Sequence, residues 1–96
     1  MKYLVDVRIH DRTAAGPYLP DHLAYLNARF DAGDFHLFGA YGDGAGGALI
    51  AEAPDAESLE KILAADPLKE GACATWVVTP FAVGRMAAEA LAPKAE

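Results

Sequence analysis

The sequence has one cysteine, few basic residues and no long apolar run, and each shortage excludes a class of protein. Cys73 alone cannot form an intrachain disulfide or a zinc site built from several thiolates. Eight Lys and Arg against fourteen Asp and Glu give a formal charge of −6, which disfavours nucleic acid and membrane surfaces as partners. No apolar run approaches the roughly 20 residues that span a bilayer, and Asp6 interrupts any signal-peptide core. We therefore expect a cytoplasmic protein.

Two kinds of apolar spacing divide the 96 residues, whose composition, 53% hydrophobic and 23% charged, is typical of one globular domain. Alternation predicts four strands, at residues 2–10, 34–41, 46–53 and 72–81. Helical spacing predicts two helices, at 20–32 and 54–66, the first after a loop that begins at residue 11. This β-α-β-β-α-β order predicts a ferredoxin-like α+β fold, with a four-stranded antiparallel sheet and two helices on one face.

The second face of this sheet has no helix to cover it. The last strand is apolar on both sides, with Trp76 on one side and Val77 on the other. A domain of residues 1–81 is too small to cover both faces, so we expect a homodimer formed through the sheet faces, as a dimeric α+β barrel. The alanine-rich tail, residues 82–96, either adds a helix or frays.

His22 lies at the edge of an apolar helical stripe. The stripe consists of Leu19, Leu23, Leu26 and Phe30. At 100° per residue, His22 falls about 60–70° from the centre of the stripe, on the flank of the buried face. A half-buried imidazole at this position is either a base for proton transfer or a boundary histidine bonded to a carbonyl group or water.

Asp66 occupies a position where the pattern requires an apolar residue. It follows Leu59 by seven residues and Ile62 by four, and so continues the apolar stripe of the second predicted helix. Pro67 ends that helix and makes Asp66 the N-cap of a further turn that ends at Gly71. An inward-facing carboxylate that caps a turn is held rigidly, as a general base or the residue that orients one must be. The alternative is that Asp66 only caps this turn and takes no part in chemistry.

The remaining motifs give weaker support for chemistry. His10 and His36 are the other histidines, and no two histidines have the spacing of a helical metal site, so we expect neither a metal nor a cofactor. The glycine-rich residues 42–47 join two strands and open no helix, which predicts a flexible hairpin and not a phosphate loop. Cys73 lies in an apolar alternating run and is expected in the core.

Residues 2–81 resemble the YciI-like family of small dimeric α+β barrel proteins. The resemblance rests on five motifs in order: a His-Leu near the start of the first helix, a glycine-led second strand, a glycine hairpin before an aliphatic strand, an Asp-Pro closing the second helix, and a Pro-aromatic closing the last strand. In this chain the motifs are His22-Leu23, Gly39, Gly46-Gly47 before Ala48-Leu49-Ile50, Asp66-Pro67 and Pro80-Phe81.

The resemblance implies a site as well as a fold. The active site proposed for the family is a His–Asp pair in a cleft, which implies that His22 and Asp66 meet. Gly39 and Phe81, from the same motifs, are expected to bind substrate.

Two positions depart from the family pattern. Many family members carry an arginine shortly before the histidine, whereas residues 18–21 of this chain read YLPD. Many members continue with Gly-Pro in the second strand, where this chain has Gly39-Ala40. Arg8 or Arg29 is then the candidate for contact with an anionic group, and we assign Arg8 to the expected substrate-binding residues.

Two functions from different classes fit these residues. In the first, Asp66 orients His22, which removes a proton from a small cyclic or aromatic organic substrate, as in a lyase, a dehydrochlorinase or an isomerase. In the second, the chain is a non-catalytic dimeric module that binds a small molecule, and the pair is a structural hydrogen bond. Solvent access to His22 distinguishes them, because a catalytic histidine must be reachable.

Overall fold

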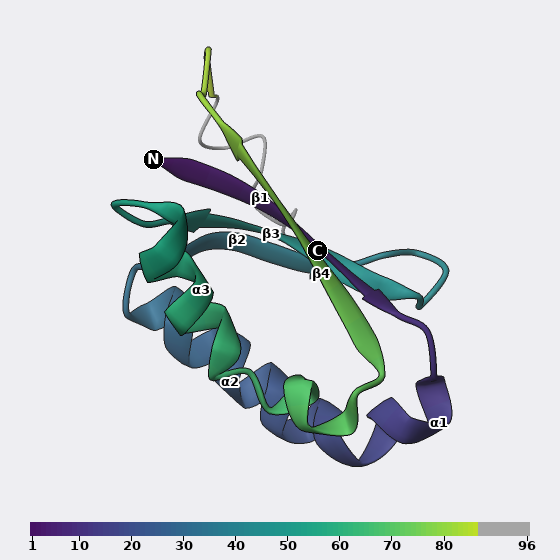
Figure 1. Cartoon of the computed structure of the whole chain (residues 1–96). Coiled ribbons are helices and arrows are strands. Elements are labelled where there is room, and N and C mark those ends of the chain that lie inside the picture. The colour runs from purple at the N-terminus through teal and green to yellow at the C-terminus, as the bar shows by residue number, and fades with distance from the viewer. Residues whose placement is uncertain (87–96) are drawn as a thin grey trace.

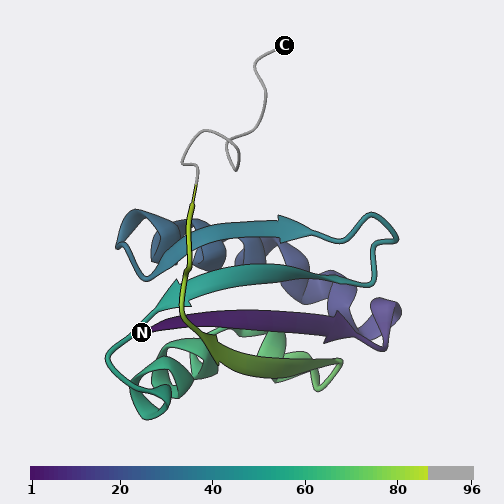
Figure 2. The same ribbon diagram turned by 90° about the horizontal axis from the view of Figure 1, so that it is seen from above.

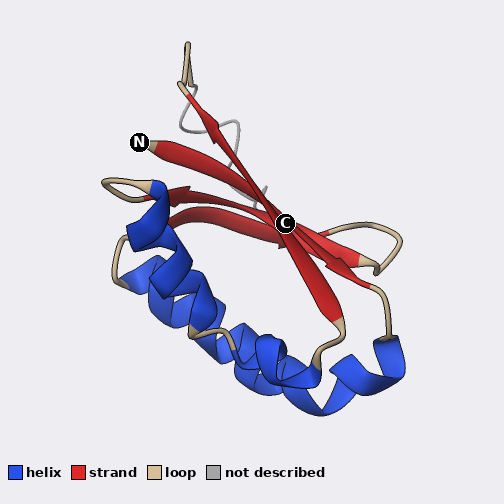
Figure 3. Ribbon diagram, viewed as in Figure 1, coloured by secondary structure: helices blue, strands red, loops and turns tan. Residues whose placement is uncertain are grey.

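A computed structural model describes residues 1–86 of the chain. It contains one sheet with helices packed on one of its faces (Figures 1 and 3). In chain order, the elements are β1 (Lys2–Ile9), α1 (Arg12–Ala15), the 3-10 turn η1 (Gly16–Tyr18), α2 (Leu19–Asp31), β2 (Phe35–Ala40), β3 (Gly46–Glu52), α3 (Ala56–Ala64), the 3-10 turn η2 (Pro67–Gly71) and β4 (Ala74–Phe81). Most of the predicted tail, residues 87–96, lies outside the described residues.

The four strands form one antiparallel sheet in the order β2-β3-β1-β4. Figure 2 shows the strands side by side in front of the helices. Two connections cross over through helices, and a tight hairpin joins β2 to β3. This topology confirms the ferredoxin-like α+β fold, with two main helices, α2 and α3, on one face.

Alternation along β1 directs its apolar side chains toward the helices. Tyr3, Val5 and Val7 are each no more than 5% exposed. Large buried side chains from the other elements complete the core: Phe35, Leu49, Leu59, Leu63 and Leu68. Burying a side chain of this size contributes about 1.5–3 kcal/mol, so this cluster holds the sheet to the helices. Cys73 is also fully buried, as the sequence predicts.

A β-bulge at His36 decides which side chains of β2 face the helices. The register with β3 shifts just after Phe35, so Phe35 and Phe38 both point to the helix side. Their rings meet Tyr25 and Phe30 of α2 edge to face, with centroids 5.9 and 6.2 Å apart. The sequence left both faces of this strand open, because alternation cannot anticipate an inserted residue.

The segment after β1 is helical where the sequence predicts a loop. Residues Arg12–Ala15 form α1 and Gly16–Tyr18 form η1, so the loop prediction is wrong there. Asp11 begins the helix, since its side chain accepts a hydrogen bond from the Ala14 N–H at 3.0 Å. Pro17 stands in the first turn of η1, where its missing N–H costs nothing.

The apolar stripe of α2 is less buried than its spacing predicts. No residue of α2, which is described in full, is buried, and Leu23 is 54% exposed. In contrast, α3 buries Leu59 and Leu63 at 1% and 3% exposure. Therefore α3 packs closely on the sheet, whereas a pocket separates part of α2 from it.

The face of the sheet opposite the helices, here called the open face, is uncovered within residues 1–86. Leu4 and Val77 on this face are 42% and 51% exposed. Polar contacts lie at its two ends: Glu52 pairs with the N-terminal amino group at 2.7 Å, and the Tyr41 hydroxyl donates to Asp6. The homodimer expected through this face stays a prediction.

Candidate functional site

A pocket of about 360 Å³ lies between α2 and the sheet. Its walls come from α2, the end of β1, and the β2–β3 hairpin with its strands. The lining residues are Val7, Ile9, Leu19, His22, Leu23, Leu26, Phe38, Gly39, Ala40, Gly44, Gly46, Gly47, Ala48 and Leu49. Within the described chain, His22 contributes the only polar side chain of this lining. A pocket of this size and character suits a small, mainly apolar organic molecule.

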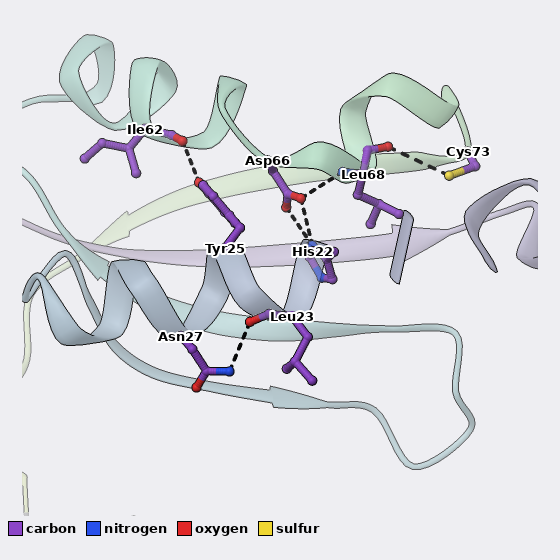
Figure 4. A network of polar contacts seen from close by, with 8 residues as sticks. All are labelled: His22, Leu23, Tyr25, Asn27, Ile62, Asp66, Leu68 and Cys73. Carbon is purple, nitrogen blue, oxygen red and sulfur yellow. Dashed lines mark hydrogen bonds and ion pairs between the residues drawn. The ribbon is translucent and has the colours of Figure 1, made fainter. Parts of the chain in front are cut away.

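His22, in the first turn of α2, meets Asp66 at the start of η2 (Figure 4). Its Nδ1 lies 2.8 Å from Oδ1 and 2.9 Å from Oδ2 of Asp66. The two residues are 44 positions apart, so only the packing of α2 against η2 brings them together. The side chain of His22 is 16% exposed and that of Asp66 is 2% exposed. Water therefore screens this contact less than it screens a surface pair.

A second hydrogen bond fixes the carboxylate of Asp66. Oδ1 accepts from the Leu68 N–H at 2.9 Å, so Asp66 is the N-cap of η2, as the sequence predicts. Its backbone is extended, with φ −66° and ψ 123°, because Pro67 disfavours the helical region for the residue before it. Asp66 thus caps a turn and also faces inward, which explains an acid on an apolar stripe.

The contact with Asp66 determines which nitrogen of a neutral His22 carries the proton. A carboxylate only accepts, so Nδ1 is the donor and Nε2 keeps its lone pair. Within residues 1–86, no hydrogen bond uses Nε2. The only buried side-chain nitrogen or oxygen without a partner in this range is Nε1 of Trp76, so the unpartnered Nε2 is not a buried atom. Nε2 is therefore accessible to solvent, and it is the atom of His22 that can accept a proton from a ligand.

Tyr25 of α2 holds α3, the helix that precedes Asp66, by a hydrogen bond. Its hydroxyl donates a hydrogen bond of 2.5 Å to the carbonyl of Ile62 in α3 (Figure 4). Burial, and then the negative charge of Asp66, raise the pKa of Tyr25 above its ordinary value. The phenol therefore stays protonated and keeps this hydrogen bond, which joins α2 to α3 one turn before Asp66.

Of the other predicted site residues, the structure brings only Gly39 to the pocket. Arg8 and Phe81 are on the open face of the sheet and do not line the pocket. Arg8 donates from Nε to Asp6 at 3.3 Å and lies 4.8 Å from the centre of the Tyr41 ring. The hydrogen bond from Tyr41, followed by the contacts from Arg8, lowers the pKa of Asp6 despite partial desolvation.

Two findings concern metals and membranes, and both apply to residues 1–86. No group of three or more His, Cys, Asp or Glu side chains is close enough to hold a metal ion in this range. No helix in the same range is both long enough and apolar enough to cross a membrane.

The pocket itself is not predicted by the sequence patterns. Leu19, Leu23 and Leu26 have the spacing of core residues and were expected to be buried, yet they line the pocket. The signal that could have found it is the run of small residues in the facing strands. Residues 39–40 and 46–48 are all glycine or alanine, so they leave space opposite α2 that larger side chains would fill.

The sequence profile of the YCII-related domain matches residues 1–82, which include every helix and strand that the structure describes. The chain belongs to the YCII-related domain family. The resemblance inferred from the sequence motifs is confirmed by this match. No curated protein sequence matches the chain.

This YCII-related chain is also similar to a solved structure, the 5-chloro-2-hydroxyhydroquinone dehydrochlorinase (TftG) from Burkholderia phenoliruptrix AC1100 in complex with 2,5-dihydroxybenzoquinone. The TM-score is 0.69, with 21% sequence identity over 88% of this chain and 96% of that chain. At this level of identity, the similarity shows a common fold.

Proposed function

We propose that this YCII-related protein is a cofactor-free, lyase-type enzyme that removes a proton from a small cyclic or aromatic organic molecule. His22 is the general base, Asp66 orients it, and Gly39 forms part of the wall that holds the substrate. The observation that carries the proposal is the contact of Nδ1 with Asp66, which leaves Nε2 without a hydrogen-bond partner on a residue that lines an apolar pocket.

The proton transfer follows from the hydrogen bonding of the imidazole. Nε2 accepts a proton from a hydroxyl or an acidic C–H group of the substrate, while Asp66 stabilises the imidazolium that forms. The electron pair left on the substrate either expels a leaving group such as chloride, as in a lyase, or moves within the molecule before the proton returns at another atom, as in an isomerase. In the first case the net loss is one proton and one anion.

The structural similarity supports the choice of reaction class. The similar protein is named a dehydrochlorinase of a chlorinated hydroxyhydroquinone, and its structure holds a dihydroxybenzoquinone. The apolar walls around His22 suit a small molecule of one or two fused rings, and the pocket volume of about 360 Å³ is at the lower end of the range for small-molecule sites.

A substrate panel tests the proposal. The protein is incubated in deuterated buffer with chlorinated hydroxyhydroquinones, hydroquinones and cyclic ketones. Chloride release reports elimination, and deuterium incorporation by NMR reports proton removal and return. We expect catalysis on at least one of these compounds. Compounds that bind in the pocket but show neither reaction would identify the chain as a non-catalytic binding module.

Ala40 gives a test of where the substrate binds. It is on the helix-facing side of β2, two residues after Phe38, and lines the pocket. Ala40→Leu is expected to raise KM or Kd about ten-fold or more, because the larger side chain occupies the space of the ligand. Its effect on unfolding is expected within about 0.5 kcal/mol, since the position is exposed. Ala64→Leu adds the same bulk to an exposed position of α3 outside the pocket lining and serves as the control; equal effects of both changes would contradict the placement.

The homodimer, its cytoplasmic location and a domain of residues 1–81 remain part of the proposal. The uncovered open face, with Leu4 and Val77 exposed, supports pairing through the sheets. Arg8 and Phe81 share this face, so we assign them to the proposed dimer interface instead of the pocket.

A further inference from the structure

Proton removal leaves a negative charge on the substrate, and the only cation that the described pocket lining offers is the imidazolium of His22. When His22 takes a proton, the electron pair remains on the substrate, commonly as an oxyanion. Apart from His22, the lining residues within the described chain are glycine or apolar. An anion in such surroundings is strongly disfavoured without a partner. A second cation, at the edge of the pocket, would reduce this penalty.

Two of the other arginines, Arg8 and Arg29, already form ion pairs with carboxylates. Arg8 is held by Asp6 on the open face, and Arg29 donates to Asp34 at 3.0 Å. The ion pairs within residues 1–86 are all formed by cations other than Arg12. Arg12, in α1, therefore has a guanidinium that no carboxylate in this range neutralises.

Arg12 lies directly against the rim of the pocket. Gly44 lines the pocket, and its φ of +74° is in the left-handed region. A Cβ added to Gly44 would lie 2.9 Å from Nη2 and 3.5 Å from Nη1 of Arg12. The guanidinium thus rests on the backbone of the β2–β3 hairpin. Both views of the chain place α1 and this hairpin at the same end of the sheet (Figures 1 and 2).

We propose that Arg12 binds an oxyanion of the substrate and so selects flat, mainly apolar molecules that carry one carboxylate or phenolate. The inference rests on the proposed function for the identity of the site, but the binding it describes does not require turnover. A guanidinium presents paired N–H donors that match a carboxylate. The ring of such a ligand contacts the apolar walls while its charged group meets Arg12 at the rim.

The test compares two probes that differ in charge but not in shape, 2-naphthoate and 2-naphthamide. Binding to the full-length protein is followed by NMR at the backbone amides of Gly39, Gly44 and Gly47. We expect the wild type to favour 2-naphthoate. Arg12→Ala should weaken 2-naphthoate about ten-fold or more, the scale of a lost charged hydrogen bond, and leave 2-naphthamide within two-fold. Arg12→Lys should restore part of the loss.

Lys61→Ala, which removes an exposed cation of α3 outside the pocket lining, is the matched control and should change neither affinity. Equal affinity of the wild type for both probes, no binding of either at millimolar concentration, or an equal effect of Arg12→Ala on both would overturn the role of Arg12. A failure of the proposed reaction can be distinguished from a failure of the proposed anion site. If Arg12→Ala selectively weakens 2-naphthoate while the substrate panel shows no reaction, the anion site stands and the enzyme does not.

Discussion

His22→Ala is expected to lower kcat/KM by about 10²–10⁴-fold, the range that a positioned general base contributes. The variant removes Nε2, the imidazole nitrogen that no hydrogen bond occupies, together with the Nδ1 donor to Asp66. The loss is expected mainly in kcat, because the base acts in the transition state while the apolar walls still hold the substrate. Steady-state kinetics on the substrate from the panel, with the pH profile of both proteins, measures it.

The control for this change is another histidine. His36→Ala removes an imidazole from the open face, where its Nδ1 lies 2.9 Å from Nζ of Lys2. It should leave kcat/KM within about two-fold. If His22→Ala retains wild-type kcat/KM while circular dichroism and thermal melting show a folded protein, His22 is not the base, and the pair is a structural contact.

Asp66→Asn is expected to lower kcat/KM by about 10²-fold or more with a small change in stability. Asparagine keeps a side-chain oxygen that can accept from the Leu68 N–H, so the cap of η2 persists. It loses the negative charge that stabilises the imidazolium and can present an N–H to Nδ1, which favours the wrong tautomer. Nitrogen chemical shifts of the His22 ring should show the exchange of tautomers, and urea unfolding should show a loss below about 1 kcal/mol.

Asp66→Ala separates the two roles of the carboxylate. It removes the cap and leaves the buried Leu68 N–H without an acceptor, so the free energy of unfolding should fall by about 1–3 kcal/mol in addition to the loss of activity. Asp55→Ala is the matched control, since Asp55 caps α3 through the Ser58 N–H and is exposed. It should cost about 1 kcal/mol and leave activity unchanged. Full activity in Asp66→Asn would mean that capping is the only role of Asp66.

Much of the fold could be predicted from local patterns. The alternation in β1 and the spacing of Leu59 and Leu63 each give one face to the core, because the period of a strand or helix is a local property of the backbone. Pro67 likewise fixed the extended backbone of Asp66. The helix at Arg12–Ala15 is not predicted by local patterns, because it has only four residues and the loop-forming Gly16 and Pro17 follow it directly, although Asp11 is a good N-cap.

The candidate site was likewise predicted in part from local patterns, and the rest depends on the tertiary structure. Helical spacing alone put His22 at the edge of a stripe and Asp66 on one, which singled out both residues before their contact was known. Their distance of 2.8 Å, the space left between α2 and the sheet, and the position of Arg12 against Gly44 came only from the tertiary structure. Periodicity specifies which side of an element a residue occupies, whereas contacts between distant residues depend on how several elements pack together.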